Sequence, residues 1–306
     1  MVEAALPFEA LSLSRCVLDE ALLMRAREKG CDVRRGVIVE RIATDRGEWL
    51  MQLRGGGSIR ARTTFLANGK HDLHGWERSG GKQCDLVGFK MHTRLGAAQT
   101  ERVRDTMELF LFPGGYGGLS LVEGGLANLC LVVQRPQLHK LGGWPELMAA
   151  ILEENGTLAE RMQDSSPSWS RPLAISPIPY GYLAKSRNDV WCVGDQAAVI
   201  PSFTGDGISI ALHSGALAAH MYLAGKNAEE YQRELHSQLN RGMLLATMLS
   251  RAIVSDKGRR LAPSLLQLMP NAMQWIASST RIPGAALAVG MAPPSLDPDI
   301  GKAHPA

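Results

Sequence analysis

The chain has 306 residues, of which 45% are hydrophobic and 21% charged. These proportions are typical of a globular protein with a sizeable core and exclude a disordered or fibrous chain, and the length is sufficient for two domains. The 33 basic and 30 acidic residues give a net charge of +3, with the basic residues scattered along the chain. We therefore expect no nucleic-acid partner.

The cysteines, the first ten residues and the late apolar run indicate the cellular compartment and the relation of the chain to membranes. Five cysteines are an odd number, and none forms a Cys-x-x-Cys pair, which predicts reduced thiols in a cytoplasmic protein rather than disulfides or a metal site. The first ten residues lack the basic and apolar regions of a secretory signal. The apolar run at 242–254 contains Ser250 and Arg251 and is shorter than the ~20 residues of a spanning helix. No integral membrane segment is expected, and a peripheral membrane contact is left open.

The first third of the chain predicts one helix followed by a meander. Ser14 precedes an amphipathic segment with Leu18 and Leu22 at helical spacing, and Gly30 stands just beyond it. This pattern indicates a capped helix that ends at a glycine. Strand-like runs then occupy 33–42, 48–53 and 59–66, separated by turn residues at 45–47 and 55–57. They predict a three-stranded antiparallel meander.

The middle of the chain predicts a second, mainly antiparallel domain. Strand-like runs at 86–95, 107–112 and 126–134 surround the sequence PGGYGG at 113–118, which we expect to be a turn. Residues 144–153 predict a helix, and the proline-rich segment 171–183 predicts a returning extended strand.

From residue 205 the pattern is almost entirely helical. Breaks are expected near Gly225, at Pro263 and at Pro283, because glycine and proline end helices. The tail at 292–306 is expected to be frayed.

The segment 194–215 follows the apolar run 189–193 and reads GDQAAVIPSFTGDGISIALHSG. It predicts a strand, a loop and a helix that starts near Gly207, with backbone N–H groups converging on an open crevice. Such a helix terminus suits an anionic or electron-rich ligand. Asp195 could accept a hydrogen bond from a ligand hydroxyl, and Asp206 could do the same or cap the helix. The alternative is an ordinary turn followed by a helix cap.

This segment resembles the second flavin motif of the FAD-dependent oxidoreductases that group the aromatic-ring hydroxylases with the geranylgeranyl reductases. The resemblance implies that Asp195 holds the ribityl chain of FAD and that the backbone of 201–208 lies against the isoalloxazine. The cofactor-binding residues that it implies are Arg15, Gly194, Asp195, Pro201, Thr204, Gly205, Asp206, Gly207 and Ile208.

Two further segments are similar to the same family. The early helix with Arg15 is similar to a family helix whose arginine lies near the flavin, the alternative being a solvated charge at a helix start. The sequence FLANGKHDLHGW at 65–76 matches a family strand that ends in an Ala-(Asp/Thr)-Gly turn, with Asn68 in place of the usual Asp or Thr. The residues that follow, 70–72, suggest a subgroup, the alternative being a solvated loop.

One family element has no counterpart in the sequence. Members begin with a strand, a glycine loop and a helix whose Gly-x-Gly-x-x-Gly meets the pyrophosphate of FAD, and no such pattern occurs here. We expect a late start of the chain. A partner chain that supplies the module, or a remnant that no longer binds FAD, are the alternatives.

The expected fold is α/β (α+β), with an incomplete FAD-binding Rossmann-like domain at 1–82 and 184–225. An antiparallel substrate domain is inserted at 83–183, and a helical region occupies 226–306. The implied function is that of an FAD-dependent oxidoreductase, either monooxygenase or reductase, for a lipid-like or aromatic small molecule. NAD(P)H is a candidate electron donor, and this chain alone is expected to bind FAD weakly or not at all. The alternative is a cofactor-free remnant that binds an apolar ligand or a partner chain.

Catalytic residues are not assigned by the sequence. Flavin carries out hydride and oxygen chemistry itself, so no acid–base pair is demanded of the protein. His92, Tyr116 and Trp169 on the middle sheet could face the flavin, and His213 follows the motif by about one helical turn, but each also suits a packing or surface role. Ser120 lacks the surroundings of a nucleophile elbow.

Overall fold

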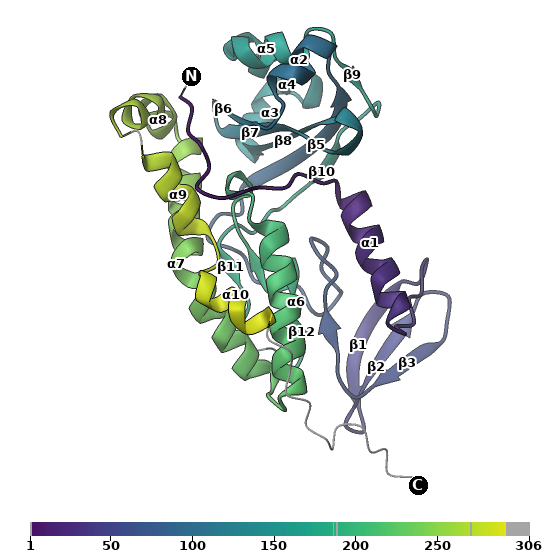
Figure 1. The fold of residues 1–306 in the computed structure, drawn as a ribbon. Coiled ribbons are helices and arrows are strands. Elements are labelled where there is room, and N and C mark those ends of the chain that lie inside the picture. The colour runs from purple at the N-terminus through teal and green to yellow at the C-terminus, as the bar shows by residue number, and fades with distance from the viewer. Residues whose placement is uncertain (1, 186, 188, 270, 292–306) are drawn as a thin grey trace. The chain divides into compact units, whose positions relative to one another are not determined.

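The computed structural model describes residues 2–185, 187, 189–269 and 271–291 (Figure 1). The described residues form two compact units, each assembled from segments far apart in the sequence. The first unit comprises Met1–Arg35, Gln83–Ile178 and Met248–Ser278, and the second comprises Gly36–Lys82, Pro179–Thr247 and Ser279–Ala306. Helices and mainly antiparallel sheets are mixed in the chain, which confirms the predicted α/β (α+β) class.

The first unit is built on an antiparallel sheet. Its strands are β5 (Leu86–Arg94), β6 (Met107–Phe112), β7 (Gly115–Leu121), β8 (Ala127–Gln134) and β10 (Leu173–Ile175), in the order β10-β5-β8-β7-β6, and β9 (Ser166–Pro167) pairs with the end of β5. Every pairing in this sheet is antiparallel. The strands predicted at 86–95, 107–112 and 126–134 are thus confirmed to within one residue.

One face of this sheet carries the core of the unit. Side chains that alternate along the strands, such as Phe112, Leu119 and Leu129, are at most 1% exposed and pack with Leu147 and Ile151. The last two belong to α4 (Trp144–Glu154), which confirms the helix predicted there and lies with α2 (Ala97–Arg102), α3 (Arg135–Leu141) and α5 (Gly156–Met162) on that side of the sheet (Figure 1). The opposite face carries the polar residues of β5 and β8.

The prediction of a turn over 113–118 is wrong beyond residue 114, because β7 begins at Gly115. In the register of β6 and β7, Gly115 lies opposite Phe112 and Gly117 opposite Phe110. A Cβ atom on either glycine would overlap the facing phenylalanine ring. The glycines therefore leave the space that the phenylalanine rings of the facing strand occupy.

The first unit also contains α1 (Arg15–Glu28), which confirms the predicted capped helix. Ser14 Oγ accepts the Val17 N–H at 3.3 Å, and Gly30 follows the helix with φ 89°. None of the helical residues is buried.

Two helices near the C-terminus complete the unit: α8 (Asp256–Leu268) and most of α9 (Ala272–Thr280). The break expected at Pro263 is wrong, since α8 continues through it. A proline removes one intrahelical hydrogen bond, and the remaining turns of α8 tolerate that loss.

The second unit begins with the meander, now β1 (Val39–Asp45), β2 (Glu48–Leu53) and β3 (Ser58–Ala61). Arg46 and Gly47 both have positive φ, 53° and 84°, as a two-residue type I′ hairpin requires. The first strand starts later than the predicted residue 33. The strand predicted at 59–66 is divided, because β4 (Phe65–Leu66) leaves the meander and pairs elsewhere.

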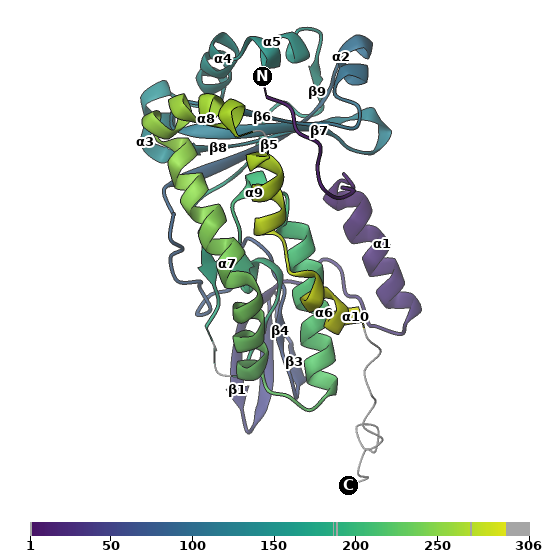
Figure 2. The same ribbon diagram turned by 60° about the vertical axis from the view of Figure 1, so that its left-hand side comes forward.

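The helices of the second unit are α6 (Gly207–Leu223), α7 (Ala228–Val254), which continues into the first unit, and α10 (Gly284–Met291). The predicted breaks near Gly225 and at Pro283 are confirmed. Helix α10 lies beside α6 (Figure 2). A short pair, β11 (Tyr182–Leu183) with β13 (Ala198–Val199), lies within the segment predicted as a returning strand and the loop after it. The predicted frayed tail, 292–306, lies outside the described residues. Within the described ranges, every helix is too short or too polar to cross a membrane.

Candidate functional site

The two segments that carry the flavin-like motifs meet in the second unit. Strand β12 (Trp191–Cys192) pairs in parallel with β4, and the ladder continues as the Val193 N–H donates to the Leu66 carbonyl at 2.9 Å. Parallel strands end at the same edge of a sheet. The turn after β4, which contains Asn68, and the Gly194-Asp195 turn after β12 are therefore brought to one edge.

Arg78 links these two turns. Its side chain is only 4% exposed and pairs with Asp72 at 2.7 Å. The same guanidinium donates to the main-chain carbonyls of Lys70 at 2.5 Å and Asp195 at 3.0 Å. Residues 70–72 are exposed, as expected of a solvated loop after the strand, and Arg78 links Lys70 and Asp72 of this loop to the motif. Their assignment to a subgroup stays a prediction.

Gln196 makes a second link between the turns. It is fully buried, and its amide nitrogen donates to the carbonyls of Gly69 at 2.8 Å and His71 at 3.2 Å. Neither Gln196 nor Arg78 is singled out by the sequence. The contacts that join the two turns are made to the carbonyls of Asp195 and Gly69, which are distant along the chain from Arg78 and Gln196, and main-chain carbonyls leave no mark in a residue pattern. The one available signal is that Gln196 immediately follows Gly194-Asp195.

Asp195 presents a carboxylate for which the described residues provide no partner. It is half-buried and lies in the 3₁₀ turn η2 (Gly194–Gln196) at the end of β12. Only its main-chain carbonyl is engaged, by Arg78. Because a half-buried carboxylate is costly without hydrogen-bond donors, this group is suited to accept a hydrogen bond from a ligand.

Gly194 fixes the start of this turn against α6. Its φ of 58° lies in the left-handed region that favours glycine. Its N–H donates to Ser214 Oγ at 2.9 Å, and Ser214 in turn donates to the Ala211 carbonyl at 3.0 Å. The turn is therefore hydrogen-bonded to α6, the helix that follows the glycine loop of the motif.

The loop before α6 leaves its glycines open. After the buried Pro201, the 3₁₀ turn η3 (Ser202–Thr204) ends at Gly205 with φ 73°, and α6 begins at Gly207. This confirms the predicted helix start. A Cβ placed on either Gly205 or Gly207 would meet no atom within 4 Å. Both glycines therefore border open space.

The first turn of α6 has free donors, as a helix N-terminus must. Among the described residues, none accepts a main-chain hydrogen bond from residues 207–209. Thr204 Oγ orders the approach to the helix by accepting the Asp206 N–H at 3.2 Å. Ile208 is 38% exposed beside these donors. The geometry combines open space, unpaired N–H groups and the positive end of a helix dipole.

Asp206 points away from this open space. It is 1% exposed, accepts a hydrogen bond from Thr280 Oγ at 3.3 Å, and has an oxygen 3.9 Å from Arg281 Nε. Burial raises the pKa of the Asp206 carboxyl, and Arg281 and then Thr280 partly offset the rise. Asp206 occupies the N-cap position of α6, and its carbonyl accepts the Ile210 N–H at 2.9 Å, but its side chain makes no capping hydrogen bond. It anchors the segment before α10 instead.

Arg15 lies in the other unit, where its exposed side chain pairs with Asp19 at 2.8 Å. Its placement near a flavin stays a prediction.

The middle sheet brings two of the other candidates together. The rings of His92 on β5 and Trp169 stack with centroids 5.0 Å apart and planes at 27°. His92 Nε2 is buried without a hydrogen-bond partner among the described residues. Burial, and then the charge of Lys90, lower the pKa of this histidine. The shift favours the neutral form of the imidazole.

The remaining candidates have packing roles. Tyr116 is 3% exposed. His213 Nε2 is 2.6 Å from Gln238 Oε1 and is occupied within the helical layer formed by α6 and α7.

Comparisons with known proteins give structural likeness without sequence likeness. No protein-family model matches the sequence, and no curated protein matches it. Among solved structures, the halogenase PltM has a TM-score of 0.63 and 13% identity, over 89% of this chain and 64% of PltM. The myxobacterial chondrochloren halogenase CndH, described as a variant of FAD-dependent halogenases, has a TM-score of 0.64 and 16% identity, over 92% of this chain and 73% of CndH.

A flavoprotein/dehydrogenase from Cytophaga hutchinsonii has a TM-score of 0.60 and 16% identity, over 90% of this chain and 74% of that protein. PltM has also been solved in complex with phloroglucinol and FAD. At these identities the likeness shows a shared fold. The chain shares its fold with these solved proteins and spans 64% of the length of PltM.

Proposed function

We propose that this chain forms the flavin-facing part of an FAD-dependent oxidoreductase. The observation that carries the proposal is the half-buried carboxylate of Asp195, with which no described residue pairs, in a turn that contacts α6, the helix preceded by the open glycine loop. The fold shared with FAD-dependent halogenases supports the same assignment. A cofactor-free remnant would leave the carboxylate and the helix donors without a ligand, so this alternative is less favoured.

The residues present fit a flavin. Asp195 would accept a hydrogen bond from a ribityl hydroxyl, as the resemblance implies. The N–H groups of 207–209 would donate to electron-rich atoms of the ring system. Gly205 and Gly207 would permit close approach, because a Cβ on either would project into the open space. FAD supplies hydride or oxygen chemistry when bound, and the protein binds it, orients it and excludes water.

Arg78 and Gln196 act as positioning residues in this proposal. They hold the turns of Asp195 and Asn68 in one arrangement through main-chain carbonyls. A binding turn fixed in this way loses less conformational freedom when the ligand arrives.

The substrate side of the proposal concerns the first unit. His92 and Trp169 form a stacked pair next to Asn128, which lies opposite His92 in the sheet. A flat pair of this kind with a neutral imidazole suits an aromatic or lipid-like small molecule. NAD(P)H as electron donor belongs to the same proposal, as do the monooxygenase and reductase alternatives.

The binding of FAD is the first test. The sequence has no Gly-x-Gly-x-x-Gly for the pyrophosphate, so we expect this chain alone to bind FAD weakly. Losing several charge-assisted hydrogen bonds, each of ~1.5–3 kcal/mol, is enough to move a tight complex into a range that does not survive desalting. Equilibrium dialysis against FAD measures such affinities, and stoichiometric retention after desalting would refute the weak-binding expectation.

Two substitutions test which residues bind FAD. Asp195→Ala and Gly207→Ala should each weaken FAD binding by about tenfold, the loss of one charge-assisted hydrogen bond or of one close approach. Gly215→Ala is the matched control, because Gly215 lies in the same helix and also has open space around its Cα. Equal affinity for FAD in wild type and Asp195→Ala would remove Asp195 from the site.

A further inference from the structure

Helix α8 exposes a row of leucines that no described residue covers. Leu261, Leu265 and Leu268 are 58%, 53% and 78% exposed. They are spaced by four and three residues, so they share one face of the helix. We call this row the α8 stripe.

The opposite side of α8 is the attached side. Arg259 lies about half a turn around the helix from Leu261, is 18% exposed, and pairs with Glu154 of α4 at 2.5 Å. The helix is therefore held to the first unit by Arg259 while the α8 stripe faces outward. No residue of α8 is buried.

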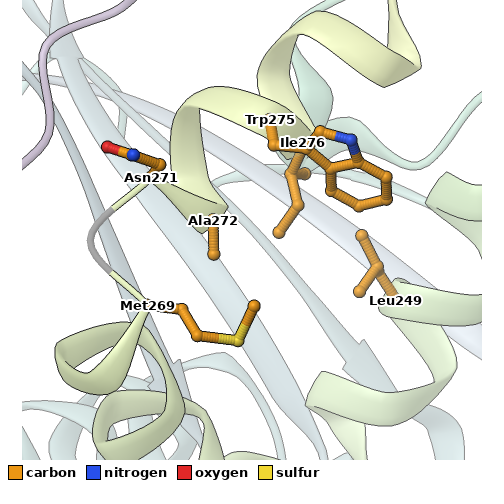
Figure 3. Close-up of a pocket in the computed structure, with 6 residues that line it drawn as sticks. All are labelled: Leu249, Met269, Asn271, Ala272, Trp275 and Ile276. Atoms are coloured by element: carbon orange, nitrogen blue, oxygen red, sulfur yellow. The ribbon is translucent and has the colours of Figure 1, made fainter.

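An apolar pocket adjoins the C-terminal end of the α8 stripe. Its volume is about 410 Å³, and Leu249, Met269, Asn271, Ala272, Trp275 and Ile276 line it. Figure 3 shows the side chains of Met269, Ile276, Trp275 and Leu249 gathered around the hollow. Met269 and Trp275 are each 60% exposed. Met269 directly follows Leu268, so the pocket and the stripe form one apolar surface.

Two exposed basic residues accompany the α8 stripe, and the helix carries one acidic residue, Asp256, at its first position. Lys257 lies one turn before Leu261 on the same face, and Arg260 flanks it. Both are exposed, and neither has an ion-pair partner among the described residues. Helix α9, which carries Trp275, has no charged residue. Exposed leucines, a tryptophan and unpaired cations together are the features of a helix that lies in a lipid interface.

We propose that the α8 stripe, Met269 and Trp275 dock this protein onto the surface of an anionic lipid bilayer. The leucines enter the boundary between headgroups and acyl chains, and Lys257 and Arg260 meet the lipid phosphates. The pocket offers space for part of an acyl chain. The contact is interfacial rather than spanning, because α8 has 13 residues and a spanning helix needs about 20. This inference does not depend on flavin binding.

Sedimentation with sucrose-loaded vesicles tests the proposal with the full chain. Wild type should bind vesicles of phosphatidylcholine with phosphatidylglycerol and bind pure phosphatidylcholine vesicles several-fold more weakly, with binding reduced by added salt. Leu265→Glu should lower the partition by at least tenfold, since it places a charge in the apolar face. Removing both Lys257 and Arg260 as alanines should lower it by about fivefold per cation.

The matched control is Leu173→Glu. Leu173 is 60% exposed on β10 of the same unit, so this variant makes the same change at similar exposure outside the surface. It should bind vesicles as wild type does, and far-UV circular dichroism should show that both variants are folded. A blue shift of tryptophan fluorescence on vesicle addition should be present in wild type and lost in Trp275→Phe.

Two outcomes would overturn the proposal. One is absence of vesicle binding by wild type, or binding that Leu265→Glu and Leu173→Glu affect equally. The other is a wild-type protein that does not bind vesicles and is a dimer in light scattering, with Leu265→Glu a monomer. That result would make the surface a contact between two copies of the chain.

Discussion

The sheet of the first unit and the motif edge of the second are stabilised in different ways. The motif edge is the edge of the β4–β12 pair where the turns containing Asn68 and Gly194-Asp195 lie. Strands β5 to β8 pair over six to eight residues each and bury an alternating set of apolar side chains against α4 and α5. Strands β4 and β12 pair over only two residues. At the motif edge, most of the fixation comes from buried polar side chains that donate to main-chain carbonyls.

The carbonyl of Cys192 illustrates the second mode. It accepts hydrogen bonds from the Tyr231 hydroxyl and from the Gln232 amide, both at 2.9 Å, and Tyr231 is fully buried. Arg78 and Gln196 likewise donate hydrogen bonds to main-chain carbonyls of the neighbouring turns. The sheet of the first unit depends on side chains packed over its face. The turns beside β4 and β12 are held by hydrogen bonds to their carbonyls, which require no layer of side chains packed over the turns.

The largest effect is expected in the apolar core. Phe112→Ala should reduce the free energy of unfolding by ~3–5 kcal/mol, because it leaves a cavity in a tightly packed layer. Leu109→Ala on the same strand should cost much less, since Leu109 is 46% exposed. Urea unfolding followed by circular dichroism measures both, and equal losses would show that the sheet core is not the main support of its unit.

A smaller but substantial effect is expected at Arg78. Arg78→Ala removes a nearly buried cation and leaves Asp72 and two carbonyls without their donor. We expect a loss of ~2–3 kcal/mol, below that of a fully buried pair because Asp72 is about a third exposed. Arg60→Ala is the control, because both side chains of the Arg60–Asp45 pair are exposed and solvent screens their attraction, so this variant should unfold close to wild type. If the two variants unfold at the same urea concentration, polar anchoring of the motif is not what fixes it.

Tyr231→Phe removes one anchoring hydroxyl. The ring is retained, so packing is preserved, while the donor shared by the Cys192 carbonyl at 2.9 Å and the Ser214 carbonyl at 3.2 Å is lost. Gln232 continues to donate to that carbonyl, so the acceptor is not orphaned and the cost should be ~1 kcal/mol. Thermal and urea unfolding measure it. A loss as large as that of Phe112→Ala would mean that the Tyr231 hydroxyl contributes far more than one ordinary hydrogen bond.

The smallest effect concerns the pH dependence of stability. The folded-state pKa of Asp206 is raised, chiefly by burial, so the folded protein holds this proton more tightly than the unfolded chain does. Stability from this group is therefore full below the ordinary carboxyl pKa of ~3.9 and is lost as pH rises through the higher folded-state value. Asp206→Asn should remove that decline between mildly acidic and neutral pH. Urea unfolding at several pH values checks it, and an unchanged slope in the variant would contradict the direction of the shift.

Local patterns determined a good part of the fold. The Ser14 cap with the glycine stop of α1, the Arg46-Gly47 hairpin turn and the start of α6 at Gly207 all follow from the conformational preferences of a few adjacent residues. The strands of the central sheet also follow from local alternation, because one face is buried and the other is not.

Two of these local expectations are wrong, each because contacts within one hairpin or one helix outweigh the preference of a single residue type. Gly115 and Gly117 form a strand instead of a turn because Phe112 and Phe110 lie across the pair and fill the space that side chains would take. Helix α8 continues through Pro263 because a single lost hydrogen bond does not outweigh the rest of the helix.

At the candidate site, the sequence by itself determined the order of Gly194, Asp195 and the glycine loop, and with it the position of the helix start. Only the tertiary structure decided that β4 lies beside β12, that Arg78 and Gln196 join the two turns, and that Asp206 faces inward to Thr280 while Asp195 keeps an unpaired carboxylate. The physical reason is that a turn or a cap depends on neighbours in the chain. The burial and pairing of a polar group depend on which distant segment packs against it, and residue spacing does not encode that choice.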